Sequence, residues 1–146
     1  MRIRLLMLGK TRRPEIRALL DDYAGRIRRF AELEMRELRE DSPAVRHGGR
    51  RIELTAGASV VLLDARGKEF SSEQFARWLG GCRDRGVREM VFLCGAAEGF
   101  PDSLARRATM KMSLSPLTFS HELARVMLAE QIYRALAQLA GHPYPK

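Results

Sequence analysis

The chain has 146 residues, a mass of 16.6 kDa and a formal net charge of +8, with 45% hydrophobic and 30% charged residues. This composition is typical of one globular domain over residues 1–146, and it excludes a disordered or fibrous protein. No apolar run approaches the ~20 residues of a membrane span, and the opening segment is too short in apolar residues for a signal peptide. We therefore expect a cytoplasmic protein with no membrane partner.

The basic charge favours a polyanionic partner. Nearly all of the 26 basic residues are arginines, whose planar guanidinium groups bind phosphate and stack on bases. Such a charge is typical of proteins that bind nucleic acid. The alternative that charge alone leaves open is a solvated surface in a protein from a genome rich in arginine codons.

Cysteine and histidine are too sparse for a disulfide framework or a metal site. Cys82 and Cys94 do not form a C-x-x-C pair, and His47, His121 and His142 lack the spacing of zinc ligands. We expect two reduced, buried cysteines and no bound metal.

The amino-terminal part of the chain predicts a strand, a helix and a second strand. Residues 1–8 are mostly apolar and are followed by Gly9, as at the end of a strand. Residues 14–30 begin with proline and continue with apolar residues at helical spacing. Residues 32–39 alternate imperfectly, so a strand is favoured and a continued helix is the alternative. Residues 41–57 are predicted to form an irregular basic loop.

Two continuous apolar runs mark the middle of the chain. Residues 58–64 and 89–95 predict strands that are buried on both faces. Between them, residues 66–68 predict a turn and residues 71–82 predict a serine-capped helix. A short helix is predicted over residues 101–108.

The carboxyl-terminal part predicts a third strand and a long helix. Residues 110–117 form the predicted strand, although Pro116 is unusual within a sheet. Residues 114–119 fit either a loop around a ligand or an edge strand. Ser120 then caps a helix that ends near Gly141. The alternation of strands and helices predicts the α/β class with a mainly parallel sheet.

Ligands of such sheets bind beyond the carboxyl ends of the strands. Three segments leave predicted strands there, at residues 63–65, 95–99 and 114–119. Gly95 and Gly99 would let the backbone approach a ligand closely, and a plain strand-to-helix turn would explain them equally well. The long last helix is apolar around more than half of its circumference. Such a helix lies in a large core or packs against a second chain, and in so short a chain we favour a second copy.

The same segments resemble the RlmH family of small SPOUT-class methyltransferases. The resemblance is carried by residues 114–119, His121, residues 125–135 and the tail His142-Pro143-Tyr144. It extends to residues 61–68, to Gly95 with Glu98-Gly99, and to the opening residues 1–10. Residues 41–57 match the family poorly.

The resemblance implies a SPOUT-type sheet flanked by helices, with a trefoil knot at about residues 89–146. It implies a homodimer that uses S-adenosylmethionine to methylate N3 of a pseudouridine in 23S ribosomal RNA. Carried over by position, the cofactor contacts would be Leu63, Gly95, Leu114, Ser115, Pro116, Leu117, Thr118 and Phe119.

The accepting imide N–H must lose its proton, so a nearby cation would stabilise the resulting anion. Arg134, with the tail residues His142 and Tyr144, is our candidate for this role. An ion pair between Arg134 and Glu130 and a merely packed Tyr144 are the alternatives. His121 is a weaker candidate that fits a helix end equally well, and Glu98 or His121 is the candidate general base.

Three positions depart from the family pattern. Ala96 replaces the second of two adjacent glycines, Ser120 replaces a proline, and Pro145 stands where the tail has histidine. The departures at Ala96 and Pro145 leave open an alternative function, a non-catalytic RNA-binding protein on a SPOUT scaffold.

Overall fold

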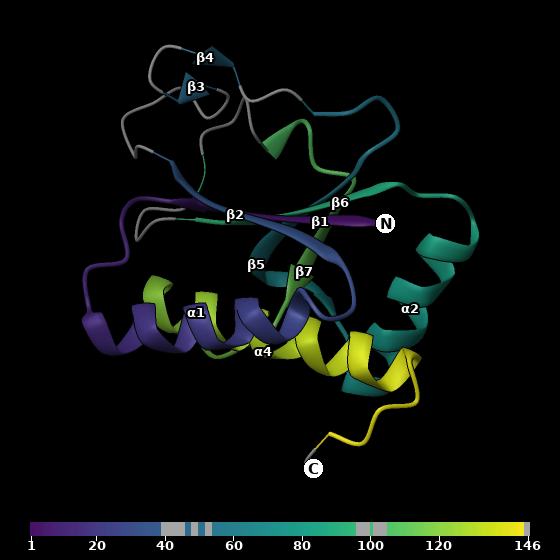
Figure 1. The fold of residues 1–146 in the computed structure, drawn as a ribbon. Coiled ribbons are helices and arrows are strands. Elements are labelled where there is room, and N and C mark those ends of the chain that lie inside the picture. Colours follow the sequence, from purple (N-terminus) through teal and green to yellow (C-terminus); the bar gives the residue numbers. More distant parts are fainter. Residues whose placement is uncertain (39–45, 48–49, 52–53, 96–99, 101–104, 145–146) are drawn as a thin grey trace.

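The structure of the protein is a computed structural model that describes residues 1–38, 46–47, 50–51, 54–95, 100 and 105–144 (Figure 1). Its main sheet contains β1 (Arg2–Leu8), β2 (Glu32–Leu38), β5 (Ser59–Glu69), β6 (Glu89–Cys94) and β7 (Met110–Ser113). Its helices are α1 (Pro14–Ile27), α2 (Ser72–Asp84) and α4 (His121–Leu139). A separate two-stranded ladder joins β3 (Arg46–His47) to β4 (Arg50–Arg51).

The five strands are arranged in the order β2-β1-β6-β5-β7, and every pairing between them is parallel. The predicted α/β class with a parallel sheet is therefore confirmed. The strand favoured over residues 32–39 is also confirmed, because Glu32–Leu38 pairs along its whole length with β1.

Alternate residues of the central strands build two apolar layers. On one face, residues such as Ile3, Leu5 and Phe92 pack against the three helices, which lie together beneath the sheet in Figure 1. On the other face, residues such as Leu6 and Leu93 form a smaller cluster. Burial on both faces explains why these strands have continuous apolar sequences.

Local sequence signals set where two of the helices begin. The Ser71 side chain accepts a hydrogen bond from the Gln74 backbone N–H, and the Gln74 side chain accepts one from the Ser71 N–H, which forms a complete capping box for α2. Ser120 caps α4 by accepting from the Leu123 N–H. Gly141, with φ of 70°, follows the helix end as predicted.

The predicted turn at residues 66–68 is wrong. β5 continues through these residues to Glu69, with an irregularity between Leu63 and Lys68 after which it pairs again with β7. A Cβ at Gly67 would lie 2.6 Å from the carbonyl carbon of Lys111 and 2.7 Å from the backbone N of Met112. Glycine is therefore required at position 67 because the two backbones approach closely. The same glycine is the residue that suggested a turn in the sequence.

The third predicted strand is also too long. β7 ends at Ser113, so residues 114–119 leave the sheet as the loop alternative expected. Proline has no N–H to donate to a strand ladder, which explains why Pro116 lies beyond the strand. The predicted helix at residues 101–108 falls mostly outside the described residues.

Replacing Gly67 by alanine is expected to destabilise the protein by about 1–3 kcal/mol, because the new methyl group overlaps backbone atoms of β7. Gly25→Ala is the matched control. Nothing lies within 4 Å of a Cβ added at Gly25, which lies inside α1, so Gly25→Ala should raise the free energy of unfolding by ~0.5–1 kcal/mol. Urea unfolding curves of both variants measure the two shifts, and a Gly67→Ala midpoint at or above that of the wild type would contradict the close approach.

No helix in the described ranges is long and apolar enough to cross a membrane. The carboxyl ends of β1, β5, β6 and β7 all lie toward one edge of the sheet, because the strands are parallel. Ligands of such sheets bind at this edge.

Candidate functional site

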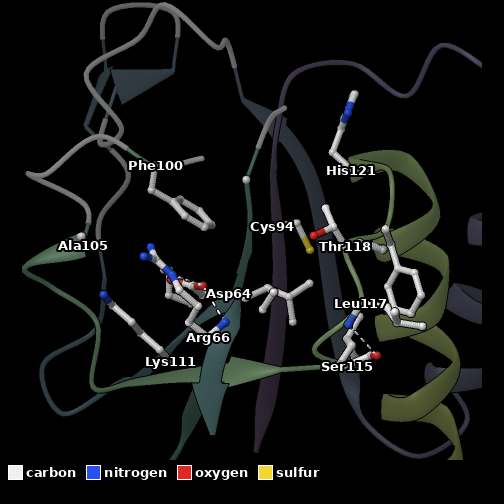
Figure 2. Close-up of a pocket in the computed structure, with 17 residues that line it drawn as sticks. Asp64, Arg66, Cys94, Phe100, Ala105, Lys111, Ser115, Leu117, Thr118 and His121 are labelled. Carbon is white, nitrogen blue, oxygen red and sulfur yellow. Dashed lines mark hydrogen bonds and ion pairs between the residues drawn. The ribbon is translucent and has the colours of Figure 1, made fainter. Parts of the chain in front are cut away.

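A cavity of about 520 Å³ lies beside the middle of β5 and beyond the carboxyl ends of β6 and β7 (Figure 2). Its size is within the range of small-molecule sites. The sequence predicts three segments at strand ends, residues 63–65, 95–99 and 114–119, and described residues of all three line the cavity. The lining also includes Leu62, Arg66 and Cys94 beside them. The first turn of α4 closes it with His121 and Ala124, and Phe100, Ala105 and Lys111 complete the lining.

Seven of the eight expected cofactor contacts line this cavity: Leu63, Gly95, Leu114, Ser115, Leu117, Thr118 and Phe119. Pro116 does not line it. The loop turns at Ser115, whose hydroxyl accepts a hydrogen bond from the Leu117 N–H at 3.0 Å. This local turn leaves Leu117 as the most exposed large apolar side chain in the described part of the chain, with 73% of its surface accessible.

The two sides of the cavity differ in chemistry. Figure 2 shows Asp64, Arg66 and Lys111 on one side, and Leu117, Thr118 and His121 on the other. Asp64 accepts a hydrogen bond from the Arg66 backbone N–H at 2.9 Å, while the Arg66 side chain remains 91% exposed. Sequence reasoning missed Arg66 and Lys111 as site residues, although both lie close to strand ends that the apolar runs identify.

The floor of the cavity contains Cys94, for which the sequence predicts only a buried thiol. Burial raises the pKa of Cys94 to about 12, although the nearby Arg125 guanidinium acts in the opposite direction. The thiol therefore stays protonated at neutral pH and is not a nucleophile.

His121 stands at the rim of the cavity, as the first residue of α4 (Figure 2). Its neighbour Glu122 is not among the residues that line the cavity, and its Oε1 accepts hydrogen bonds from the backbone N–H groups of Arg12 and Arg13. The Arg13 hydrogen bond is the main cause that lowers the pKa of Glu122, against the effect of burial. Glu122 is therefore ionised and holds the backbone of Arg12 and Arg13. At the rim of the cavity, His121 is the candidate base.

The remaining candidates lie together at the other end of α4. Arg134 pairs with Glu130, with Nη2 and Oε1 2.7 Å apart, and its Cζ lies 4.6 Å from the centroid of the Tyr144 ring. The Tyr144 ring contacts Tyr133 edge to face, with centroids 4.6 Å apart. We call Arg134, Tyr144 and the residues that surround them the tail cluster; its other members are Tyr23, Phe30, Tyr133 and His142.

The tail cluster is remote from the cavity within one chain. Arg134 is 13 positions after His121 along α4, which at 1.5 Å per residue is a rise of about 20 Å. Burial, and then hydrogen bonding to Tyr23, raise the pKa of Tyr144 far above its usual range, so its phenol is neutral. The ion pair that the sequence offers as an alternative for Arg134 is present, and Arg134 also supports Tyr144.

Among the described residues, no group of three or more histidine, cysteine, aspartate or glutamate side chains is placed to hold a metal ion. Glu98, Ala96 and Pro145 lie outside the described residues.

Comparison with known proteins identifies relatives along the whole chain. The family model described as "Predicted SPOUT methyltransferase" matches residues 1–145. A protein of Geobacter metallireducens named "Ribosomal RNA large subunit methyltransferase H" is 44% identical over 151 residues, which cover 99% of this chain and 98% of its own length. A protein of Sorangium cellulosum with the same name is 41% identical and covers 99% of both chains.

Solved structures show the same fold at much lower sequence identity. A probable methyltransferase from Bordetella pertussis Tohama I has a TM-score of 0.56 at 12% identity, covering 92% of this chain and 93% of its own. A probable methylase family protein from Haemophilus influenzae has a TM-score of 0.57 at 11% identity, covering 99% of this chain and 72% of its own.

Proposed function

Since this chain belongs to the SPOUT methyltransferase family, we propose that it methylates ribosomal RNA of the large subunit, at N3 of a pseudouridine in 23S RNA. The observation that carries the proposal is the full-length similarity to relatives named for this activity, together with a cavity at the strand ends. These relatives are named as enzymes, so the non-catalytic alternative is dropped.

The methyl donor is S-adenosylmethionine, which supplies a methyl group already activated by a sulfonium. The cavity fits such a molecule. It combines apolar walls at Leu62, Leu63 and Phe100 for a base, with hydroxyls at Ser115 and Thr118 for hydrogen bonds. Its cations, Arg66 and Lys111, suit a carboxylate or a phosphate.

The protein's own contribution is to position the acceptor and to manage its proton. Holding two reactants in the productive geometry supplies much of the rate enhancement in such a transfer. The N3–H proton leaves as the new N–C bond forms, and His121 at the rim or Glu98 is the candidate that takes it. Arg134, with His142 and Tyr144, is proposed to stabilise the negative charge that develops on the ring.

A second copy of the chain would bring the tail cluster to the cavity. Within one chain the two lie about 20 Å apart, too far for Arg134 to touch a base held at the cavity. We therefore propose a homodimer in which the tail of one chain completes the cavity of the other.

The surface proposed for this dimer is smaller than the sequence of α4 suggests. Most of the apolar circumference of α4 packs against α1, α2 and the sheet of the same chain. The apolar residues left exposed are Leu123 and Met127 on α4, with Leu117 in the adjoining loop. These three residues, which we call the rim patch, are the proposed contact surface.

Sedimentation at micromolar concentration is expected to give about twice the mass of 16.6 kDa. Obligate interfaces are apolar at their centre, so Leu123→Glu with Met127→Glu should dissociate the dimer by burying charges without partners. Leu19→Glu is the control, because Leu19 is equally exposed on α1, outside the rim patch. A wild-type monomer would contradict a site shared between two chains. A double variant that stays dimeric would contradict the rim patch as the contact surface.

Three further features belong to the same proposal. The chain forms one domain over residues 1–146, its carboxyl-terminal part at about 89–146 is knotted, and it works in the cytoplasm beside the ribosome. The sheet order supports the knot, because the segment between β6 and β7 has to cross β5.

The direct test maps methyl groups by mass in ribosomal RNA from a strain that lacks this gene. We expect one pseudouridine to lose its methyl group, and purified protein with labelled S-adenosylmethionine to restore it on those ribosomes. Calorimetric titration should show micromolar cofactor binding. Unchanged RNA masses together with an absence of cofactor binding would overturn the proposal.

A further inference from the structure

Three cations lie in the short loop that joins β1 to α1. Lys10, Arg12 and Arg13 all have exposed side chains, whereas Thr11 between them is 4% exposed. Gly9 turns the chain out of the strand with φ of 84°, a conformation that favours glycine. We call Lys10, Arg12 and Arg13 the loop cations.

The first two turns of α4 hold this loop in place. Glu122 accepts hydrogen bonds from the N–H groups of Arg12 and Arg13 at 3.0 and 3.1 Å. It thereby caps α1, whose own N-cap residue Arg13 makes no side-chain cap. Arg125, which is completely buried, donates to the Thr11 hydroxyl at 2.8 Å and to the Leu8 carbonyl.

These contacts are made by the backbone of the loop and by the Thr11 side chain. The long side chains of the three loop cations therefore remain directed to solvent. Keeping Glu122 and Arg125 buried is unfavourable unless each is well hydrogen-bonded. Both groups serve to fix one loop, which indicates that its position matters.

The fixed loop lies beside the cavity. β1 pairs with β6 so that Met7 is opposite Cys94, and Cys94 forms the cavity floor. Glu122, which binds the loop, directly follows His121 at the cavity rim. The loop cations therefore lie on the β1 and α4 side of the cavity. Arg66 and Lys111 lie on the opposite side (Figure 2).

Arginines at the opposite edge of the sheet are neutralised within the chain. At the amino ends of the strands, Arg2 pairs with Glu32 and Glu34, and Arg4 pairs with Glu34 and Glu89. In the described part of the chain no carboxylate forms an ion pair with the side chain of a loop cation. The loop cations, which have no ion-pair partner among the described residues, fit an external polyanion.

We propose that the loop cations bind phosphates of the RNA beside the target nucleotide, and that Glu122 and Arg125 are positioning residues for them. This inference rests on the proposed function, because it takes the substrate to be RNA. Phosphate contacts fix the register of a protein on nucleic acid. Contacts on one side of the cavity would hold the RNA strand at the cavity and so strengthen substrate binding.

The test uses ribosomes from the strain that lacks this gene, with Lys10, Arg12 and Arg13 changed together to alanine. Each cation that no longer neutralises a phosphate should lower the slope of log affinity against log salt by about 0.7–0.9. We therefore expect the slope to fall by about 2, with at least a tenfold rise in KM for ribosomes. The kcat and the calorimetric affinity for S-adenosylmethionine should be nearly unchanged.

A matched control removes the same charge elsewhere. Arg28, Arg77 and Arg88 are exposed, lie outside the cavity and are changed together to alanine. Equal effects of the two triple variants would show that only net charge matters and would overturn the inference. So would weakened cofactor binding in the loop variant, or a loop variant that binds ribosomes like the wild type. A wild-type protein that methylates no ribosomal RNA would instead refute the proposed function.

The positioning role of Glu122 has its own readout. Glu122→Gln alone should raise KM for ribosomes several-fold, whereas adding it to the loop variant should change KM no further, because the side chains it orients are gone. Equal effects in both backgrounds would mean that Glu122 only stabilises the fold. Urea unfolding measures that contribution separately.

Discussion

Replacing Gly95 by valine is expected to lower the affinity for S-adenosylmethionine about 100-fold while the protein remains folded. Gly95 lines the cavity directly after the buried strand β6, so a branched side chain there occupies space that the ligand needs. Steric overlap of this kind costs about 1–3 kcal/mol, and each ~1.4 kcal/mol is a factor of ten in affinity.

Calorimetric titration of the cofactor measures this loss, with circular dichroism as the check on folding. Gly25→Val is the control, because it makes the same chemical change in α1 with nothing within 4 Å of the new Cβ. Wild-type affinity in a folded Gly95→Val protein would rule out the cavity as the cofactor site.

Arg134→Ala is expected to slow methyl transfer by two or more orders of magnitude with little change in cofactor affinity. A cation that stabilises developing charge acts on the transition state more than on the ground state. Its removal should cost about 3 kcal/mol if it resembles the loss of an oxyanion-hole donor. Single-turnover transfer of labelled methyl to ribosomes, beside calorimetry, separates the two effects.

Arg26→Ala is a closely matched control for this variant. Arg26 also forms an i,i+4 ion pair, with Asp22, and its Cζ lies 5.7 Å from the ring centroids of Tyr23 and Tyr133 in the tail cluster. It should leave transfer nearly unchanged. Equal loss of transfer and cofactor affinity in Arg134→Ala would assign Arg134 to the pocket instead.

Deleting residues 142–146 is expected to have the same effect as Arg134→Ala: methyl transfer becomes much slower, and the affinity for the cofactor changes little. Tyr144→Phe then separates the role of the Tyr144 ring from that of its hydroxyl. The ring that packs on Arg134 and Tyr133 is kept, and the neutral hydroxyl is removed. Transfer that survives the deletion would contradict a part for the tail in the reaction.

The location of the cavity could be predicted from sequence because it follows from strand direction. The buried apolar runs identify parallel strands, and such strands bring their carboxyl ends to one edge. Gly95 and the loop from Leu114 to Phe119 therefore had to lie close together, although the strand that precedes that loop is shorter than its apolar residues suggest.

Contacts between distant segments could not be predicted in this way. The cap of α1 comes from Glu122, more than 100 residues further along the chain. No local motif marks it, because Arg13 is a poor capping residue and the local signals for the helix start are Pro14 and the acidic Glu15 in the first turn. The distance between Arg134 and the cavity was hidden for a related reason, since one helix carries both His121 and Arg134 and sequence proximity suggests a single site.

The position of β6 in the sheet has a consequence for folding. It is the central strand, yet Glu89–Cys94 follows β1, β2 and β5 in the chain and therefore emerges from the ribosome after them. Until it arrives, β1 has one open edge and β5 has no partner, and both present apolar side chains. Pairings across such sequence separations form slowly, and open apolar edges attract other chains. The nascent protein therefore passes through an interval of aggregation risk that ends only when β6 and β7 have both been synthesised and paired.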